Sequence, residues 1–589
     1  MSNLIIKRTE WRLSRPAGGV GCCALLFVAS CTLTDRSNQK IELGVDPAVA
    51  SLAQSAAFRE TIGALTYYDG LGTLSVRGYG LVMGLGKNGS RECPSAVRDQ
   101  LVQSIIKMQP ATGTPLETKQ LRPEQLIGDP DTAVVIVRGE IPPGAVEGTR
   151  FDVSVTALPG TQTRSLRGGR LFPCELEVFR ETGPGRSISG RIVARASGPL
   201  FLNPFSEEGG GAAINPLEAV IIRGGRAVQP RDLRLVLGRP SYAMAQRVQD
   251  RINTRFQTDR KISDAVSPSF VELRIPRDFH GDTAHFLGLV RALFLSTDPS
   301  FEASRARALA DEMAHPAAPH ALISLALEGL GRNALPVLPT LYAHERDHVS
   351  FYAAAAGVRL GDHVAVDALS KQAHDSRSPY RFQAIRALGS ARGMANAGHD
   401  LRELLNEEDP RVQAAAYEAL IDRDDPYIRS TEVGRDNFRL DVVPTRRENM
   451  VYVKRTESRR VALLGDGWRT TPPLHYSAPD GTFVLDAHPE DRNVTLLRII
   501  PATDTRSPPI SAPFELPALV SLLGCDPELD AGGSAMGVGL DYAAVAGALY
   551  QLCHDQSINA HFVVEQPNVA ELFGPGKPAG RPESELPVN

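Results

Sequence analysis

The chain has 589 residues, of which 42% are hydrophobic and 22% are charged. This length allows two or more domains, and this composition is typical of soluble globular domains rather than disordered chains. The 64 lysines and arginines are balanced by 68 acidic residues, which leaves a formal net charge of −4. The overall basic excess that favours nucleic-acid binding is therefore missing, and we expect no nucleic-acid partner.

The first 31 residues have the pattern of a bacterial export signal. Basic residues between positions 7 and 15 precede an uncharged apolar segment at 18–29. That segment is shorter than the roughly 20 apolar residues that span a bilayer. It ends in Val28-Ala29-Ser30-Cys31, which resembles a lipobox, where the cysteine becomes the new N-terminus and carries the lipid. We predict a lipoprotein signal over 1–31 with lipidation at Cys31; a plain signal peptide and an uncleaved anchor are the alternatives.

Four cysteines remain in the mature chain if this signal is removed and Cys31 is lipidated: Cys93, Cys174, Cys525 and Cys553. An even number of thiols suits an oxidising compartment, but their spacing does not determine a pairing. They lie far apart, without the C-x-x-C spacing of zinc sites, so the sequence predicts no zinc site.

The segment after the signal changes character twice before residue 300. Residues 32–57 are polar and small, as in a tether. From 58 to 300, short apolar runs alternate with turn signals, and the alternation at 151–155 is typical of a half-buried strand. We predict helices at Ser95–Met108 and Tyr242–Phe256 within this β-rich region.

Residues 301–436 are predicted to form an α-helical block. Two similar alanine-rich segments, 379–388 and 410–420, recur at an interval of about 31 residues, which lies in the range of helical repeats such as HEAT. Pro379 and Pro410 are expected at helix starts, where the missing N–H costs nothing. We expect about four helix pairs, which carry their own apolar faces and fold as a unit.

Strand character returns after the helical block. Apolar runs predict strands at 438–443, 451–456, 460–464, 482–487, 494–500 and 560–565, and helices at 516–523 and 542–553. These elements form a C-terminal α+β domain at 437–566, and the charged, glycine- and proline-rich tail at 567–589 is predicted to be disordered. The fold class is α+β, with β-rich domains interrupted by a HEAT-like helical solenoid.

A glycine motif at Gly84, Gly86 and Gly89 satisfies G-x-G-x-x-G between a predicted strand and a predicted helix. A dinucleotide site would need an acidic residue about 20 residues later, at the end of a second strand. Met108, Gln109 and Pro110 stand there instead, and the following strands do not alternate with helices. We interpret the motif as a turn in which glycine permits positive φ, and we predict no cofactor.

A second motif, His344-Glu345-Arg346-Asp347-His348, satisfies H-E-x-x-H. On one helix its histidines could bind zinc, with Glu345 as general base. The Arg346-Asp347 pair argues against this, because burying unpaired charges is costly. We interpret the motif as a solvated turn between helices, and we predict no metal site and no catalytic residue.

A locally basic region could contact an anionic partner such as a cell-wall polymer. A solvated surface is the favoured interpretation of such charge runs. The region contains Arg164, Arg167, Arg170, Arg180, Arg186, Arg191 and Arg195.

Several stretches resemble the flagellar P-ring protein family, in that family's order. Residues 78–89 (GYGLVMGLGKNG) resemble its early GYGLVVGLNGTG segment, and residues 148–157 (GTRFDVSVTA) resemble its G-x-x-I-D-V-T-V-S-S strand. Residues 165–171 (SLRGGRL) are similar to S-L-x-G-G-T-L. The resemblance covers about 70–300, and it resumes over 437–566 after the helical block, which is an insertion into the family pattern.

The resemblance implies a structural, non-enzymatic subunit without a cofactor. The family forms a homo-oligomeric periplasmic ring around the flagellar rod, at the peptidoglycan layer and beside the outer-membrane ring. Its implied partners are further copies of the chain, rod and outer-membrane ring proteins, and peptidoglycan. With the lipobox, we expect a lipid anchor in the outer membrane. The alternative is an envelope lipoprotein scaffold that binds a protein partner through the concave surface of its helical repeats.

We predict that Cys31→Ala leaves an unlipidated precursor, because the thiol that accepts the lipid is lost. Mass spectrometry of the envelope protein measures this, and Cys23→Ala, within the removed signal, is the matched control. A wild-type mature N-terminus without lipid would contradict the prediction.

Overall fold

The computed structural model describes residues 56–108, 122–181, 187–202, 215–435, 437–500, 505–527 and 537–565. The predicted signal, Cys31, the tail and most of the tether lie outside these ranges. The chain divides into two compact units, Met1–Glu42 and Leu43–Asn589, and all described residues belong to the second. No helix among the described residues is both long and apolar enough to cross a membrane.

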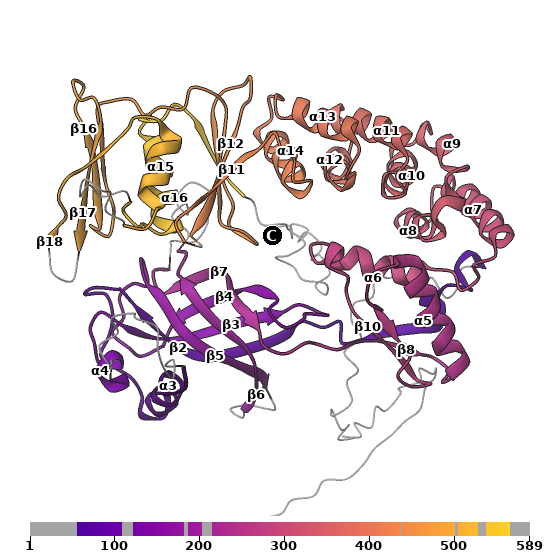
Figure 1. The fold of residues 1–589 in the computed structure, drawn as a ribbon, viewed down its shortest axis with the longest axis horizontal. Coiled ribbons are helices and arrows are strands. Elements are labelled where there is room, and N and C mark those ends of the chain that lie inside the picture. Colours follow the sequence, from indigo (N-terminus) through magenta and orange to yellow (C-terminus); the bar gives the residue numbers. More distant parts are fainter. Residues whose placement is uncertain are drawn as a thin grey trace, which may run out of the picture. The chain divides into compact units, whose positions relative to one another are not determined.

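Six antiparallel strands close on themselves into one sheet, here called the closed sheet (Figure 1). Buried and exposed residues alternate along β4, so Phe151, Val153 and Val155 reach the inner core. This is the half-buried strand that the sequence predicts. The strand order is β2 (Leu74–Met83), β3 (Ala133–Ile141), β4 (Arg150–Ala157), β7 (Glu218–Ala227), β6 (Ser187–Pro199) and β5 (Arg170–Glu181).

Two helices cover part of the outer surface of the closed sheet. They are α3 (Ser95–Met108), as predicted, and the short α4 (Pro123–Ile127). Leu101 and Ile105 of α3 form a second core with strand residues such as Leu81 and Val134. These strand residues alternate with those that point into the closed sheet, so β2 and β3 are apolar on both faces.

A second, open sheet has the order β1 (Thr66–Asp69), β8 (Leu233–Leu237), β10 (Phe270–Leu273) and β9 (Ser263–Asp264). It packs with α2 (Ile62–Leu65), α5 (Tyr242–Phe256) and α6 (Thr283–Ala292) around a core that includes Val248, Leu235 and Phe286. The predicted helix at Tyr242–Phe256 is confirmed. A 3-10 turn, η4 (Arg277–Phe279), precedes α6.

Arg231 links the closed sheet to this open sheet. Its guanidinium donates from Nη1 to the carbonyl oxygen of Ile141 at 2.8 Å and from Nη2 to that of Gly72 at 2.5 Å. The chain crosses between the two sheets after β1, where Gly72 lies, and again before β8, where Arg231 lies. The hydrogen bond from Arg231 to Gly72 therefore links the two crossings.

Eight α-helices follow between residues 299 and 422, in agreement with about four expected pairs; their HEAT-like classification stays a prediction. Pro410 is the first residue of α14, as predicted, and Asp409 caps that helix. The prediction for Pro379 was wrong, because α12 begins two residues later. The helices are α7 (Pro299–Met313), α8 (His320–Leu330), α9 (Leu338–Tyr342), α10 (Asp347–Arg359), α11 (His363–His374), α12 (Arg381–Ser390), α13 (Ala395–Leu404) and α14 (Pro410–Asp422).

The C-terminal part contains a five-stranded mixed sheet and a smaller antiparallel sheet. The first has the order β11 (Arg429–Val433), β12 (Phe438–Val443), β14 (Arg460–Leu464), β13 (Met450–Val453) and β20 (His561–Val564). The second contains β15 (Leu474–Ser477), β16 (Phe483–Ala487), β17 (Val494–Ile500), β18 (Thr505–Arg506) and β19 (Ile510–Ala512). Two helices, α15 (Leu516–Gly524) and α16 (Tyr542–His554), pack between these strands in one core. Strand β11 lies within the segment 301–436 that the sequence analysis assigned to helices.

Both faces of the five-stranded sheet are buried at its strands β13 and β14. Val451 and Leu463 point into the core with α15 and α16, whereas Tyr452 and Leu464 point into the core of the helices α7–α14. Strands buried on both sides have continuous apolar runs, which explains why β13 and β14 do not alternate. The core of α7–α14 also contains Phe294, from the other side of the block.

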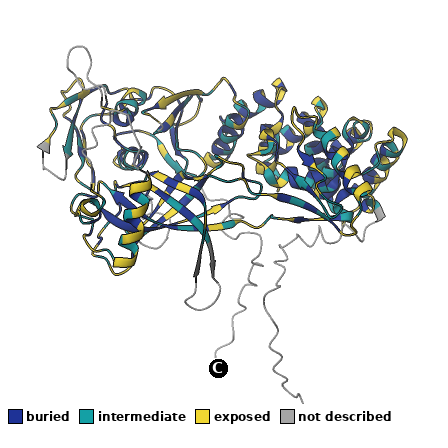
Figure 2. Cartoon of the chain, turned by 60° about the horizontal axis from the view of Figure 1, so that its bottom comes forward, coloured by how far each residue is buried: buried dark blue, intermediate teal, exposed yellow. Residues whose placement is uncertain are grey.

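Most residues of this core come from the helices α7–α14 themselves, and a few residues from both flanking segments complete it. That the block folds as a unit stays a prediction. Figure 2 shows buried residues where these helices meet and exposed residues on their outer sides. Removal of the block would uncover one face of the five-stranded sheet.

A buried ion pair joins the first helix of the block to the preceding segment. The Arg251 side chain on α5 lies 3.3 Å from the Glu302 carboxylate on α7, and these side chains are 6% and 9% exposed. Arg251 also donates to the carbonyl oxygens of Phe294 at 2.7 Å and Gly329 at 3.2 Å. Its buried charge is thus both paired and hydrogen-bonded, as such charges need to be.

A second buried network joins the last helix to the sheet. The carboxylate of Asp441 on β12 is fully buried and accepts from the Tyr417 hydroxyl at 2.5 Å and from Arg460 Nη1 at 2.6 Å. Ser430 on β11 donates to its other oxygen. Burial and the charge of Asp441 raise the pKa of Tyr417 well above its usual value, so the phenol stays protonated and donates.

We predict that Asp441→Ala lowers the free energy of unfolding by about 3–5 kcal/mol, because it leaves the largely buried Arg460 without its carboxylate. Tyr417→Phe removes one hydrogen bond and should cost about 1–3 kcal/mol. Urea denaturation measures both, with Asp466→Ala at an exposed position as a control within about 0.5 kcal/mol of wild type. Equal stability of all three variants would contradict this assignment.

Candidate functional site

The glycine motif forms a turn after β2 that is occupied by a carboxylate. Gly84 and Gly86 have φ of +83° and +61°, which confirms the interpretation as a positive-φ turn. Their backbone N–H groups donate to Asp131, at 3.2 Å to Oδ2 and 2.6 Å to Oδ1. These are the groups that would bind a phosphate in a dinucleotide site. Nothing in the sequence pattern had identified Asp131.

The H-E-x-x-H motif lies between two helices. Because α9 ends at Tyr342 and α10 begins at Asp347, the two histidines do not share a helix. Residues 344–346 form the interhelical turn that was expected, whereas Asp347 and His348 belong to α10. His344 Nδ1 accepts the backbone N–H of Arg346 at 3.1 Å. Across the described ranges, no group of three or more metal-ligating side chains is placed to hold an ion.

We expected His348 to be solvated, but the structure shows that it is partly buried. Its ring packs edge-on against that of His320 at 4.5 Å between centroids. Burial lowers the pKa of His320, and the neighbouring His348 lowers it further, so the imidazole is neutral at neutral pH. The pair is a packing contact between α8 and α10.

The four cysteines that the structure describes, Cys93, Cys174, Cys525 and Cys553, are all free thiols. Cys174 lies in the core of the closed sheet and Cys553 in the C-terminal core, which excludes a disulfide between these two in the folded chain. Burial raises the pKa of each to about 12, so both stay protonated and unreactive.

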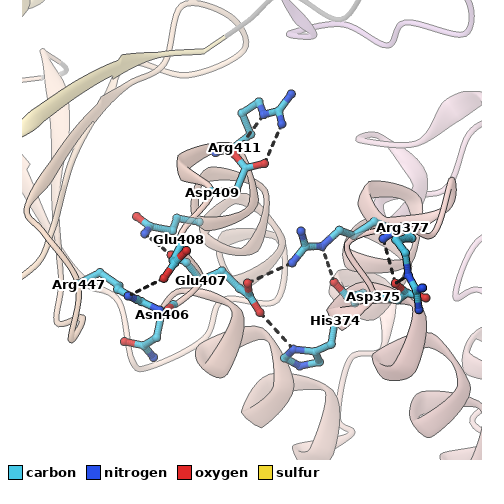
Figure 3. Close-up of polar contacts among 12 residues, drawn as sticks. His374, Asp375, Arg377, Asn406, Glu407, Glu408, Asp409, Arg411 and Arg447 are labelled. Carbon is cyan, nitrogen blue, oxygen red and sulfur yellow. Dashed lines mark hydrogen bonds and ion pairs between the residues drawn. The ribbon is translucent and has the colours of Figure 1, made fainter.

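A junction of loops surrounds Glu407, between α13 and α14 (Figure 3). Its carboxylate lies 3.2 Å from Arg381 Nη2 and 3.6 Å from His374 Nδ1. From the loop between β12 and β13, Arg447 donates to the carbonyl oxygen of Asn406 at 2.6 Å. These contacts hold helix ends together and leave no nucleophile beside a general base.

A cleft of about 270 Å³ lies between α3 and the closed sheet. Tyr79, Gln100 and Lys107 line it together with the carboxylates of Glu175 and Glu177. It lacks the paired nucleophile and base of a covalent mechanism.

The closed sheet carries an arginine row that the sequence analysis only partly identified. Arg150, Arg226 and Arg195 are directly opposite one another across β4, β7 and β6, and all three are exposed. One carboxylate, Glu175 on β5, continues the row and lies 3.7 Å from Arg195. Arg195 came from the predicted basic region, whereas Arg150 and Arg226 join it through strand register. Arg186 and the side chain of Arg180 lie outside the description.

The open sheet has an acidic row on the face away from α5 and α6. Asp69, Arg234, Glu272 and Asp264 are in register across β1, β8, β10 and β9. In the described part of the chain, none of the three carboxylates forms an ion pair; Arg234 pairs with Asp232 at 3.4 Å. The adjacent row on this face is apolar, with Tyr67, Val236 and Phe270.

Comparison with known proteins gives the same family as the sequence motifs. Residues 61–303 match the family model described as flagellar P-ring protein. A flagellar P-ring protein of Bradyrhizobium sp. (strain BTAi1) is 29% identical over 267 residues, which cover 43% of this chain and 64% of that relative. That of Nitratidesulfovibrio vulgaris is 28% identical over 256 residues, which cover 42% and 62% of the two chains.

The matched segment therefore spans a little under two thirds of these relatives' length. It contains the closed sheet and the open sheet with α5 and α6, and it ends where α7 begins. The helical block and the C-terminal resemblance lie outside the match. Over residues 61–303, the chain is similar to the flagellar P-ring protein family.

Proposed function

We propose that the chain is a structural subunit of a periplasmic ring of the P-ring type, built from copies of itself around the flagellar rod. The observation that carries this proposal is the family match over 61–303, because that segment corresponds to two complete sheets with their own cores. A structural subunit needs stable cores and exposed surfaces that bind its neighbours.

The motifs that could support an enzyme all have structural explanations. The carboxylate of Asp131 accepts hydrogen bonds from the N–H groups of the glycine turn. The H-E-x-x-H residues are divided between a turn and a helix. The proposal therefore gives the chain no catalytic residue and no cofactor.

The helical block acts in this proposal as a connector between the family segment and the C-terminal sheets. The Arg251–Glu302 pair and the Asp441 network support this role, because both lie at the ends of the block. The alternative, a scaffold that binds another protein through its helices, has no comparable feature in its favour. A HEAT-like repeat remains our proposal for how these helices are related.

The proposed location is the periplasm, at the flagellar basal body, with Cys31 carrying a lipid in the outer membrane. The proposed partners are rod proteins, outer-membrane ring proteins and peptidoglycan. A single lipidated cysteine with several acyl chains gives a stable anchor, because each buried CH₂ contributes ~0.8 kcal/mol.

We predict that the full-length protein, extracted from envelopes with detergent, forms a megadalton ring visible by electron microscopy. A strain that lacks the gene should lose motility and regain it with the wild-type gene. A strictly monomeric protein at micromolar concentration, together with unchanged motility of the deletion strain, would contradict the proposed function.

We predict that Glu345→Gln leaves stability within about 0.5 kcal/mol of wild type and motility unchanged, because its side chain is exposed in a turn. His348→Ala should lower the free energy of unfolding by about 1 kcal/mol through the lost contact with His320, again with normal motility. Stoichiometric zinc in the wild type that His348→Ala removes would contradict a structural role.

A further inference from the structure

Two histidines, here called the histidine pair, lie against each other inside the helical block. His320 is the first residue of α8 and is 9% exposed, and His348 lies in the first turn of α10. The ring of Tyr352, also on α10, stacks on His320 at 6.2 Å between centroids. The Nε2 atoms of both histidines are buried and, within the described ranges, have no hydrogen-bond partner. A proton added to Nε2 therefore finds no acceptor in this packing, and a buried charge without a partner is costly.

Burial is the main reason why a proton on His320 is unfavourable. It lowers the pKa of His320, and the neighbouring His348 and the guanidinium of Arg346 lower this pKa further by repulsion. The backbone carbonyl oxygens of Met313 and His315 act in the opposite direction, because they accept hydrogen bonds from the ring, but they do not offset the burial. Among the described groups that act on His320, none is a carboxylate. The folded chain therefore keeps His320 neutral at a pH at which the unfolded chain already protonates it.

The other end of α8 is held by contacts that tolerate mild acid. Glu328, near that end, lies 3.0 Å from Nε2 of His285 on α6, and both side chains are largely buried. A proton on His285 therefore lies beside a carboxylate and turns this contact into an ion pair. From α5, Arg255 donates to the carbonyl oxygen of Glu328 at 3.1 Å, and Arg251 donates to that of Gly329 at 3.2 Å. The two ends of α8 thus differ in how they respond to a proton.

We propose that the histidine pair makes the helical block acid-sensitive: in a mildly acidic medium, protonation of His320 loosens the packing of α8 against α10 but leaves α8 attached to α5 and α6. The stability that this contact contributes is complete above about pH 6.5, the ordinary pKa of a histidine. It is lost as the pH falls below that value, since the unfolded chain then binds more protons than the folded chain. The inference goes beyond the proposed function and depends only on the packing of these helices.

The test is urea denaturation of the full-length protein in detergent, at neutral pH and at about pH 5. His320→Asn cannot take up a proton in this range, and its side-chain amide retains a donor for the carbonyl oxygens of Met313 and His315. Acidification should raise the unfolding equilibrium constant of the wild type about fivefold more than that of His320→Asn. His399→Asn, at an exposed histidine on α13, is the matched control and should keep the acid response of the wild type. An equal acid response of the wild type and His320→Asn would overturn the inference.

Hydrogen exchange of the wild type locates the acid response without any substitution. The measured quantity is the protection factor of each amide, which corrects for the intrinsic effect of pH on exchange. Protection in α10 should fall about fivefold between the same two conditions, whereas protection in α6 should change by less than about twofold. Unchanged protection of α10, or an equal loss in α6 and α10, would contradict a local response of the histidine pair.

Discussion

The carboxylate of Asp441 is the point on which the C-terminal half of the structure depends. It is a fully buried charge on a strand whose two faces both lie in a core. A buried charge is tolerated only when partners surround it, and here they come from a helix, an edge strand and a neighbouring strand. The position of α14 on the sheet is thereby coupled to the pairing of β11, β12 and β14.

The same sheet connects the core of the helical block to the C-terminal core. An amphipathic helix contributes an apolar surface, and a sheet with two apolar faces needs a cover on each. The helices α7–α14 supply one cover and α15 with α16 supply the other. The core of the helices α7–α14 thus extends into the strands β12, β13 and β14 that follow them.

The sequence predicted long, periodic elements well. The helices Ser95–Met108 and Tyr242–Phe256 have the expected bounds, because each is long enough for a period of 3.6 to be evident. The short strands β1, β8, β9 and β10 were not predicted individually, since strands of two to five residues with one covered face carry too little pattern. Strand β11, mostly exposed along its length, gave no apolar signal at all.

The candidate surfaces were harder to predict than the elements. Arg150 and Arg226 are distant in sequence and become neighbours only through strand register, which a single sequence does not specify. The role of Asp131 in the glycine turn depends in the same way on a contact across the fold. The interhelical turn at His344, by contrast, could be predicted because its evidence, charged residues between apolar segments, is local.

The free thiols have a consequence for how the protein matures. Disulfide formation and reshuffling take seconds to hours, which makes them a slow step for many exported proteins. Cys174 and Cys553 lie in separate cores and remain reduced, so the folding of these cores does not wait for oxidation. The cores around Cys174 and Cys553 can therefore form without a disulfide step, and a reducing environment would leave both cores intact.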